Sequence, residues 1–224
     1  MPKTNPAQRV GVFVDVQNLY YSARNIYNSR VNFNEVLKVA VGDRQLMRAI
    51  AYVIKADMPE EHTFFDALDK AGFEVKSKEL QTFYGGNQKG DWDVGIAVDV
   101  IKMMSKLDVA VLCGGDGDFA PLVEYLQSSG LLVEVCAFGK STSGKIKEMV
   151  DTFVDLDESK KYLMPMKGFH LFPYSRGKEP KTNPNKNLST NTKSDNTQSS
   201  NGASANPTRL ESRKAKTLDL DAEL

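Results

Sequence analysis

Short apolar runs alternate with stretches of helical periodicity between residues 8 and 163. The run VGVFVDV at residues 10–16 has too few polar positions for a half-exposed strand, and it predicts a strand buried on both faces. Comparable runs predict five more strands, at residues 46–56, 73–80, 108–115, 131–138 and 153–156. Strands that alternate with helices predict a parallel sheet between two helical layers, joined by right-handed crossovers.

The segments between these runs carry apolar residues three and four positions apart, which predicts helices. The first expected helix follows residue 16 and ends before Asn32, and a short second one is capped by Asn32 or Asn34 and runs through Val39. A third is opened by Met58-Pro59-Glu60 and ended by Gly72. Three more are expected at residues 93–107, 119–129 and 145–150. With the usual doubly wound strand order 3-2-1-4-5, the first strand lies beside the fourth. The predicted fold is therefore a three-layer α/β/α, Rossmann-like domain with a mostly parallel central sheet.

The composition changes near Pro165, where Asn, Ser, Thr, Lys and Pro begin to dominate. Such a segment buries too little apolar surface to offset its ordering entropy, so we expect a domain at residues 8–163 and a disordered, mildly basic tail at 164–224. Residues 1–166 carry 19 Lys and Arg against 23 Asp and Glu, while the remainder carries 10 against 6. The zero net charge of the whole chain excludes a strongly basic nucleic-acid binder. The basic tail either brings RNA or an acidic partner close to the domain or only keeps the chain soluble.

Cysteine and histidine are scarce, which excludes a zinc site in practice. The chain has two of each: Cys113, Cys136, His62 and His170. Both cysteines lie in apolar runs, and we expect small buried thiols in a reduced, cytoplasmic protein. The first residues lack the apolar core of a secretion signal, and no stretch approaches the ~20 apolar residues of a membrane span. We therefore expect no membrane association.

Acidic residues follow two predicted strands that are expected to be neighbours. Asp15 ends the first strand, with Asn18 one turn later, and Asp116 and Asp118 follow the fourth strand within the glycine-rich turn GGDGDF. Ligands of open parallel sheets gather at this carboxyl edge. Two carboxylates about 4 Å apart repel by roughly 4 kcal/mol at an effective dielectric of 20, and a hard cation removes that cost. Oxygen ligands suit Mg²⁺ or Mn²⁺, which favours phosphodiester chemistry.

Each of these residues also has a simpler interpretation. Asp15, which follows an apolar run, could serve only to end the strand or as a cap, and Asp118 could serve only as the N-cap of the following helix. Trp92 either packs on the domain or stacks on a base, and Lys89 either contacts phosphate or is an ordinary surface lysine.

Further acidic residues occupy the helix at residues 93–107 and its start. Asp91 and Asp93 are suited to capping as well as to a site, and either alone is as well explained by one role as by the other. Asp99 shares a helical stripe with Lys102 and Lys106, so it belongs either to a solvated ion pair or to the site.

Three segments, FVDVQNLY, KGDWDVGIAVD and CGGDGDFAPLV, occur in an order that resembles the NYN domain of the PIN-like nuclease superfamily, in particular its LabA-like bacterial group. The resemblance covers residues 8–158 and implies a metal-dependent ribonuclease of PIN-like fold. It implies that Mg²⁺ or Mn²⁺ is held by four carboxylates, Asp15, Asp93, Asp116 and Asp118, and that Asn18 orients the phosphate or a metal-bound water. The stretch after Gly90 is one residue longer than the family's usual Lys-Gly-x-Asp, which leaves Asp91 as the alternative to Asp93.

Other functions compete with the nuclease. A regulatory protein could keep the acidic pocket and bind RNA or a nucleotide without turnover. A phosphatase of the aspartyl-phosphate type requires a second Asp two positions after Asp15, where this chain has Gln17. A dinucleotide-dependent enzyme requires a G-x-G-x-x-G sequence after the first strand, and that sequence is missing there.

Overall fold

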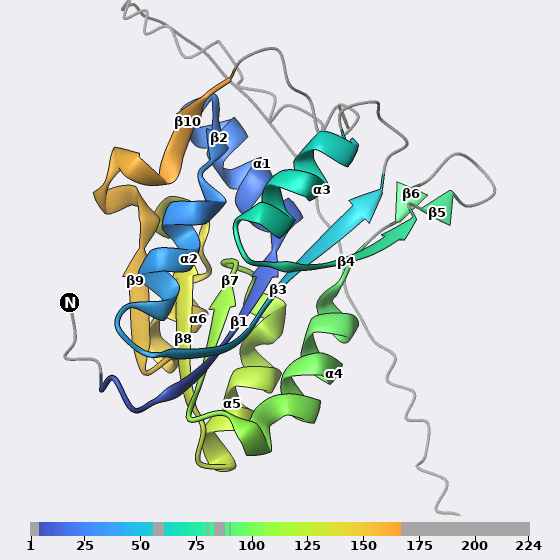
Figure 1. Cartoon of the computed structure of the whole chain (residues 1–224). Coiled ribbons are helices and arrows are strands. Elements are labelled where there is room, and N and C mark those ends of the chain that lie inside the picture. The colour runs from blue at the N-terminus through green and yellow to red at the C-terminus, as the bar shows by residue number, and fades with distance from the viewer. Residues whose placement is uncertain (1–4, 56–60, 80, 83–87, 90, 167–224) are drawn as a thin grey trace, which may run out of the picture. The chain divides into compact units, whose positions relative to one another are not determined.

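A six-stranded, entirely parallel sheet forms the centre of the molecule (Figure 1). The computed structural model describes residues 5–55, 61–79, 81–82, 88–89 and 91–166. The strands lie in the order β4 (Glu74–Glu79), β3 (Gln45–Lys55), β1 (Arg9–Asp15), β7 (Val109–Cys113), β8 (Leu132–Ala137) and β9 (Thr152–Asp155). The predicted order is confirmed, and the last predicted strand extends the sheet beyond β8.

Strands β1 and β7 lie side by side in the middle of the sheet. Val10 pairs with Val109 and Val14 pairs with Cys113, and every residue of β7 is buried. Burial on both faces explains why these strands read as continuous apolar runs. Because the two strands run in the same direction, the residues that follow Val14 and Cys113 emerge at the same edge.

Helices cover both faces of the sheet and confirm the three-layer α/β/α fold (Figure 1). Their bounds are α1 (Val16–Tyr27), α2 (Phe33–Val41), α3 (Glu61–Lys70), α4 (Asp93–Met103), α5 (Ala120–Ser128) and α6 (Gly144–Met149). The rings of Phe33 and Phe64 meet at 5.8 Å between α2 and α3, and Gln127 of α5 donates to the carbonyl of Met149 in α6. Right-handed crossovers place α1, α2 and α3 on one face and α4, α5 and α6 on the other.

Capping residues end and begin these helices largely where the sequence predicts. Asn32, rather than Asn34, caps α2 by accepting a hydrogen bond from the amide of Glu35. Gly72 follows α3 with a φ of +96°, a conformation that favours glycine. The predicted start of this helix at residues 58–60 lies outside the described residues.

Helix α4 is apolar on two sides. It buries Ile96, Val100 and Met103 against the sheet, whereas Val94 is 74% exposed and Val98 and Ile101 are each 41% exposed. The apolar residues whose spacing predicts this helix include these three exposed positions. That spacing therefore marks mostly the outer side of the helix, whereas packing on the sheet decides which side is buried. Among the described residues, no helix combines the length and the apolar character needed to span a bilayer.

Two small antiparallel ladders complete the described structure. Strand β2 (Ser29–Val31) pairs with β10 (Leu163–Pro165), and β5 (Gln81–Thr82) pairs with β6 (Gln88–Lys89). Strand β10 crosses the predicted domain boundary at residue 163, and the described chain continues to Met166. The rest of the predicted tail lies outside the described residues.

Candidate metal centre

Asp15 stands at the junction between β1 and α1, where it caps the helix. Its Oδ1 accepts a hydrogen bond from the amide of Asn18 at 3.0 Å. Burial raises the pKa of Asp15 to about 6; the Asn18 amide opposes this, and the nearby charges of Asp93 and Asp116 add to it. The capping interpretation is thus confirmed, and the same carboxylate also lies within the field of the acidic edge.

The turn after β7 carries the second group of carboxylates. Asp116 accepts a hydrogen bond from the amide of Asp118 at 3.0 Å and so caps the single 3-10 turn Gly117–Phe119 that leads into α5. The side chain of Asp118 makes no cap: the residue before α5 is Phe119, which has no side-chain capping bond. Capping therefore explains Asp116 in part and leaves the exposed carboxylate of Asp118 without such a role.

Close packing requires glycine in this turn. A Cβ atom at Gly115 would lie 2.5 Å from Oγ1 and 2.8 Å from Cα of Thr142, in the loop after β8. The same glycine donates its amide to Oδ1 of Asn18 at 2.9 Å and accepts a bond from the amide of Ser143 at 3.0 Å. These contacts fix the turn against both α1 and the loop after β8, which aims Asp116 and Asp118 along the edge.

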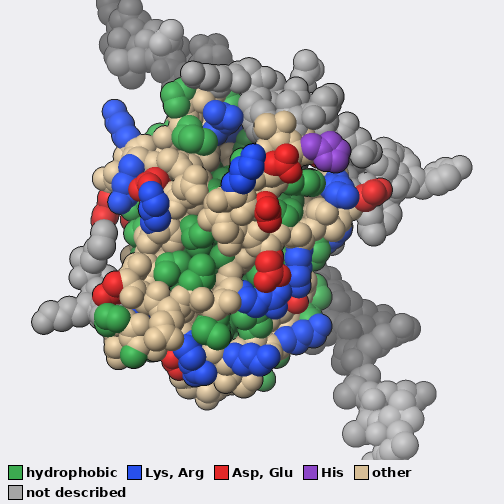
Figure 2. Space-filling model, viewed as in Figure 1, with side chains coloured by type: hydrophobic (Ala, Val, Ile, Leu, Met, Phe, Trp, Pro, Cys, Tyr) green, Lys and Arg blue, Asp and Glu red, His purple; other side chains and the backbone are tan. Residues whose placement is uncertain are grey.

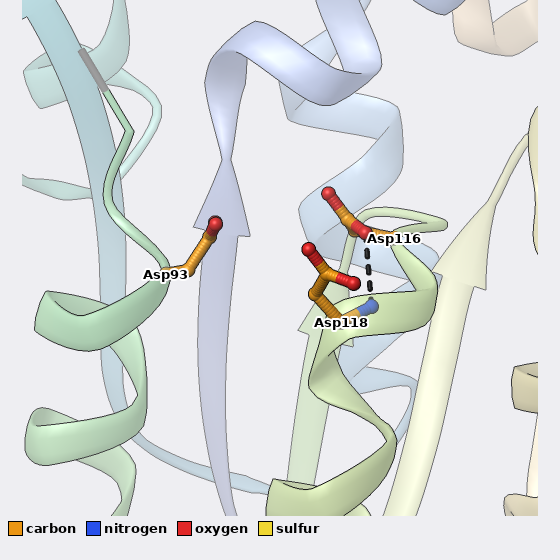
Figure 3. Close-up of side chains that lie close together, drawn as sticks. All are labelled: Asp93, Asp116 and Asp118. Carbon is orange, nitrogen blue, oxygen red and sulfur yellow. Dashed lines mark hydrogen bonds between the residues drawn. The ribbon is translucent and has the colours of Figure 1, made fainter. Parts of the chain in front are cut away.

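Asp93 completes a cluster of three carboxylates. It is the first residue of α4, and the preceding residue, Trp92, makes no side-chain capping bond. One carboxylate oxygen each from Asp93, Asp116 and Asp118 lies within 4.8 Å of the other two, and Figure 3 shows Asp93 pointing across from α4 toward the turn that bears the other two. Burial and the charges of Asp91, Asp116 and Asp118 raise the pKa of Asp93, while Lys78 opposes the rise.

The donor set fits a hard cation. Three carboxylate oxygens without sulfur or imidazole are the ligands that Mg²⁺ and Mn²⁺ accept, usually with several waters. Within the described part of the chain, no Lys or Arg forms an ion pair with any of the three. Among the described residues, the cluster therefore concentrates negative charge that no ion pair neutralises.

The structure brings together three of the four predicted ligands. Asp15 interacts electrostatically with Asp93 and Asp116 but is not part of the close cluster, so its assignment as a ligand stays a prediction. Asp91 likewise acts on Asp93 through its charge and lies outside the close cluster. Geometry thus favours Asp93 over Asp91 for the central position.

Asp99 belongs to a different network. It accepts hydrogen bonds from the hydroxyl of Tyr52 at 2.9 Å and from Nζ of Lys76 at 2.7 Å. Burial acts to raise the pKa of Asp99, but the bonds from Lys76 and Tyr52 outweigh it and lower the pKa. The ion pair runs to Lys76 of β4 rather than to the predicted Lys102 or Lys106, because α4 packs with this side toward β3 and β4.

The two remaining predicted contacts differ in what the structure shows of them. Trp92 donates its Nε1 hydrogen to the carbonyl of Val53 at 2.9 Å and packs on Tyr52, with ring centroids 5.2 Å apart. Packing on the domain is therefore observed for Trp92, and stacking on a base stays a prediction. Lys89 lies in β6, and its side chain lies outside the described part of the structure.

Sequence reasoning missed Lys78, Thr142 and Ser143. Lys78 follows Glu74 and Lys76 at every second position of β4, a charged alternation that marks one side of a strand. Thr142 and Ser143 follow β8, and the only signal for them was that β8 also ends at the carboxyl edge.

An apolar cavity of about 230 Å³ lies away from the acidic cluster, between α2 and α3. It is lined mainly by apolar and aromatic side chains, among them Tyr20, Phe33, Phe64, Leu68 and Met164. Figure 2 shows this face of the molecule, where patches of hydrophobic surface lie between charged groups. The cavity shares no residue with the carboxylate cluster, so the two features are separate.

Comparison with known proteins agrees with this geometry. Residues 9–157 match the NYN domain family. The low amplitude and bright protein LabA of Synechococcus elongatus is 25% identical over 170 residues, which cover 69% of this chain and 87% of that protein. A crystal structure of a protein of unknown function from Vibrio parahaemolyticus is 34% identical with a TM-score of 0.66, covering 72% of this chain and 99% of the other.

Proposed function

This chain belongs to the NYN domain family, and we propose that it is a metal-dependent ribonuclease whose reaction centre is the carboxylate cluster of Asp93, Asp116 and Asp118. The observation that carries the proposal is the convergence of three carboxylate oxygens within 4.8 Å at the carboxyl edge of a parallel sheet. Membership of the family indicates a nuclease-type function, and the cluster supplies a place where such chemistry can occur.

The three carboxylates would hold Mg²⁺ or Mn²⁺, which supplies a nucleophilic water at neutral pH and offsets charge on the phosphate. Asp116 holds its position through the bond from the Asp118 amide, so these two carboxylates are oriented together. Asp93 reaches the cluster from the opposite side, on α4. Residues on two separate elements therefore define where a scissile phosphate would bind.

Asp15 and Asn18 support the cluster from β1 and α1. The Oδ1 atom of Asn18 is already used by the amide of Gly115, so any contact of Asn18 with the phosphate falls to its Nδ2 group. Asp15 orients Asn18 through its bond to the Asn18 amide and, when ionised, adds negative charge beside Asp93 and Asp116. We propose that Asp15 assists metal binding in this way, directly or through a water.

The test is cleavage of labelled single-stranded RNA by purified protein in Mn²⁺, in Mg²⁺ and in chelator. We expect cleavage only with metal, and a loss of at least about a hundredfold for Asp116→Asn, because changes to residues that merely support a metal ligand already cost about 10–100-fold. Asp116→Asn retains an oxygen that can accept the Asp118 amide, so the turn is preserved. Asp69→Asn, on the exposed surface of α3, is the matched control and should cleave normally.

Two results would contradict the proposal. Cleavage that persists in chelator would show that a metal is not needed, and undiminished cleavage by Asp116→Asn would remove this cluster from the reaction. RNA binding without turnover in either metal would instead favour the regulatory RNA-binding alternative, which uses the same pocket.

A further inference from the structure

The side of β4 that faces α4 carries a row of charged residues. Glu74, Lys76 and Lys78 alternate along the strand, and Lys78 lies near its carboxyl end, paired with Ile54 of β3. Arg48 forms an ion pair with Glu74, and Lys76 forms one with Asp99 at 2.7 Å. Within the described residues Lys78 has no carboxylate at ion-pair distance, so it differs from the other cations on this side of the sheet.

Lys78 instead lies over the indole of Trp92. Its Nζ is 4.9 Å from the centre of the ring, within the range of a cation–π contact. The side chain is exposed, so its ammonium group remains accessible to a ligand. A lysine held in this way is partly ordered without having its charge neutralised.

The indole is itself firmly positioned. Trp92 donates to the carbonyl of Val53 at 2.9 Å, and its ring packs on the fully buried Tyr52. On α4, a Cβ atom at Gly95 would lie 2.5 Å from Cε3 of the indole, so the ring lies directly against the helix backbone. Val53, Tyr52 and Gly95 therefore fix the surface on which Lys78 rests.

This arrangement brings a cation next to the acidic cluster. Trp92 directly precedes Asp93 in the chain, and the charge of Lys78 acts to lower the pKa of Asp93 against the larger effects of burial and neighbouring carboxylates. Residues 1–166 carry 19 Lys and Arg against 23 Asp and Glu, so the domain offers RNA no general attraction. Carboxylates without a bound ion repel a phosphate backbone, so a protein cation beside them favours its binding in addition to any metal.

We propose that Lys78 is a phosphate-binding residue of the site, which the Trp92 ring holds beside Asp93 so that it contacts the backbone of a bound RNA strand. The inference rests on the proposed function and extends it by naming a substrate contact. Trp92 then acts through Lys78 as a positioning residue. An ammonium group suits this role because it is a compact charge that binds phosphate without fixed directionality.

The experiment measures how salt affects RNA binding. Binding of a fluorescein-labelled single-stranded RNA is followed by anisotropy in chelator, where the proposed reaction does not run, for the unmodified protein, Lys78→Gln and Lys78→Arg. Loss of one phosphate contact should reduce the slope of log K against log salt by about 0.7. Lys78→Arg should keep the slope, because it keeps the charge. Lys106→Gln is the control, since Lys106 lies beyond the opposite end of α4, about 20 Å from Asp93 by helix rise.

Steady-state cleavage in Mn²⁺ gives a second measure. We expect Lys78→Gln to raise KM severalfold with kcat changed less than about twofold, which a general loss of structure would not produce. Trp92 is the only tryptophan in the chain, so its emission reports on the contact directly. RNA binding should change this emission in the unmodified protein and leave it nearly unchanged in Lys78→Gln.

The outcomes separate this inference from the function on which it rests. Unmodified protein that cleaves RNA while Lys78→Gln keeps both the parental slope and the parental KM would overturn the role of Lys78 alone. Equal effects of Lys106→Gln and Lys78→Gln would also overturn it, since bulk charge would then explain both. Protein that neither binds nor cleaves RNA would overturn the proposed function and this inference together.

Discussion

The two ends of the β1–β7 strand pair treat carboxylates in opposite ways. At the amino end, Arg9 contacts Asp108 through its backbone amide, its Nε and its Nη2, at 2.8, 3.1 and 2.7 Å, and these bonds lower the pKa of Asp108 to about 2. At the carboxyl end, burial and neighbouring carboxylates raise the pKa of Asp15 to about 6. A carboxylate thus stands at each end of this strand pair, but among the described residues only the one at the amino end is bonded to a cation of the chain.

The difference lies in whether the chain supplies a cation. Away from the carboxyl end, the buried Glu134 is also paired, with Arg44 at 2.8 and 2.9 Å through two parallel hydrogen bonds. At the carboxyl end, Asp93, Asp116 and Asp118 have no ion-pair partner among the described residues. Paired carboxylates stabilise the fold by themselves, whereas the unpaired cluster gains stability only when an ion binds.

The largest effect is expected where a protein cation is removed. Arg44→Met should lower the free energy of unfolding by about 3–5 kcal/mol, because it leaves the buried carboxylate of Glu134 without a partner. Urea unfolding measures the change. The double variant Arg44→Met/Glu134→Leu is the control and should recover much of the loss, and a single variant within about 1 kcal/mol of the parent would mean that Glu134 is not held by Arg44.

The reverse change is to supply a cation at the carboxyl end. Mn²⁺ at a hundred times its dissociation constant should stabilise the protein by about 2.7 kcal/mol, and Asp116→Asn should gain far less. In chelator the order should be inverted: Asp116→Asn should melt higher than the parent, because it removes one repelling charge. Calorimetry with and without Mn²⁺ measures both, with Asp69→Asn as the control. A destabilised Asp116→Asn in chelator, together with no response to Mn²⁺ in either protein, would rule out the metal site.

The free energy of unfolding should depend on pH in opposite directions at the two ends of the strand pair. Asp15 binds its proton more tightly in the folded state than its ordinary pKa of 3.8 implies, so metal-free protein should lose stability as the pH rises from about 4 to about 6. We expect this loss in the free energy of unfolding to be about 1–2 kcal/mol. It is smaller than the pKa shift of Asp15 alone implies, because the side chain is partly exposed and solvent screens it. Asp108 contributes in the opposite direction, since its pKa is lowered: its stabilisation is complete above about pH 4 and is lost as the pH falls toward 2.

Urea unfolding in chelator at several pH values tests this difference. The profile of Asp15→Asn should lack the decrease between about pH 4 and pH 6 and keep the decrease in stronger acid. Identical profiles for Asp15→Asn and the parent would show that the carboxyl end does not hold Asp15 in the way described.

The smallest effect on stability is expected from removing the residues that follow Met166. Cutting the chain after Met166 should change the free energy of unfolding by less than about 0.5 kcal/mol and should leave the response to Mn²⁺ intact, because both carboxylate regions lie within residues 9–134. Cutting after Leu163 is the matched comparison. It removes Met164 and Pro165 from β10 and their pairing with β2, so it should cost about 1 kcal/mol more. Equal stability of the two truncated chains would mean that β10 adds nothing.

Much of the fold was predictable because one rule acts on a clear pattern. Continuous apolar runs identify buried parallel strands, and the usual doubly wound strand order then predicts that β1 and β7 are neighbours. That adjacency predicts the meeting of Asp15 and Asp116 at one edge. The β2–β10 pair was missed because strands of three residues, separated by most of the domain, have no periodicity to detect.

The arrangement of side chains within the site was less predictable. The rotation of α4 about its axis decides that Asp99 meets Lys76 while Asp93 faces the turn after β7, and that rotation depends on how Ile96, Val100 and Met103 pack. Lys78 could not be identified from its position in the sequence, because its role depends on Trp92, which comes from a separate segment. Such contacts are determined by how different elements pack on one another, and the spacing of residues along a single element does not predict that packing.

The three carboxylates of the cluster come from separate parts of the chain, and this affects the lifetime of the folded protein. Asp93 lies on α4 and Asp116 and Asp118 lie after β7, so the three oxygens meet only once α4 has docked on the assembled sheet. A partly folded chain that lacks this docking has no complete site. We expect α4 to dock after the folding transition state, and an interaction that forms at that stage slows unfolding while it leaves the folding rate nearly unchanged. The bound ion would therefore lower the unfolding rate, and the lifetime of the folded protein would depend on the concentration of divalent metal.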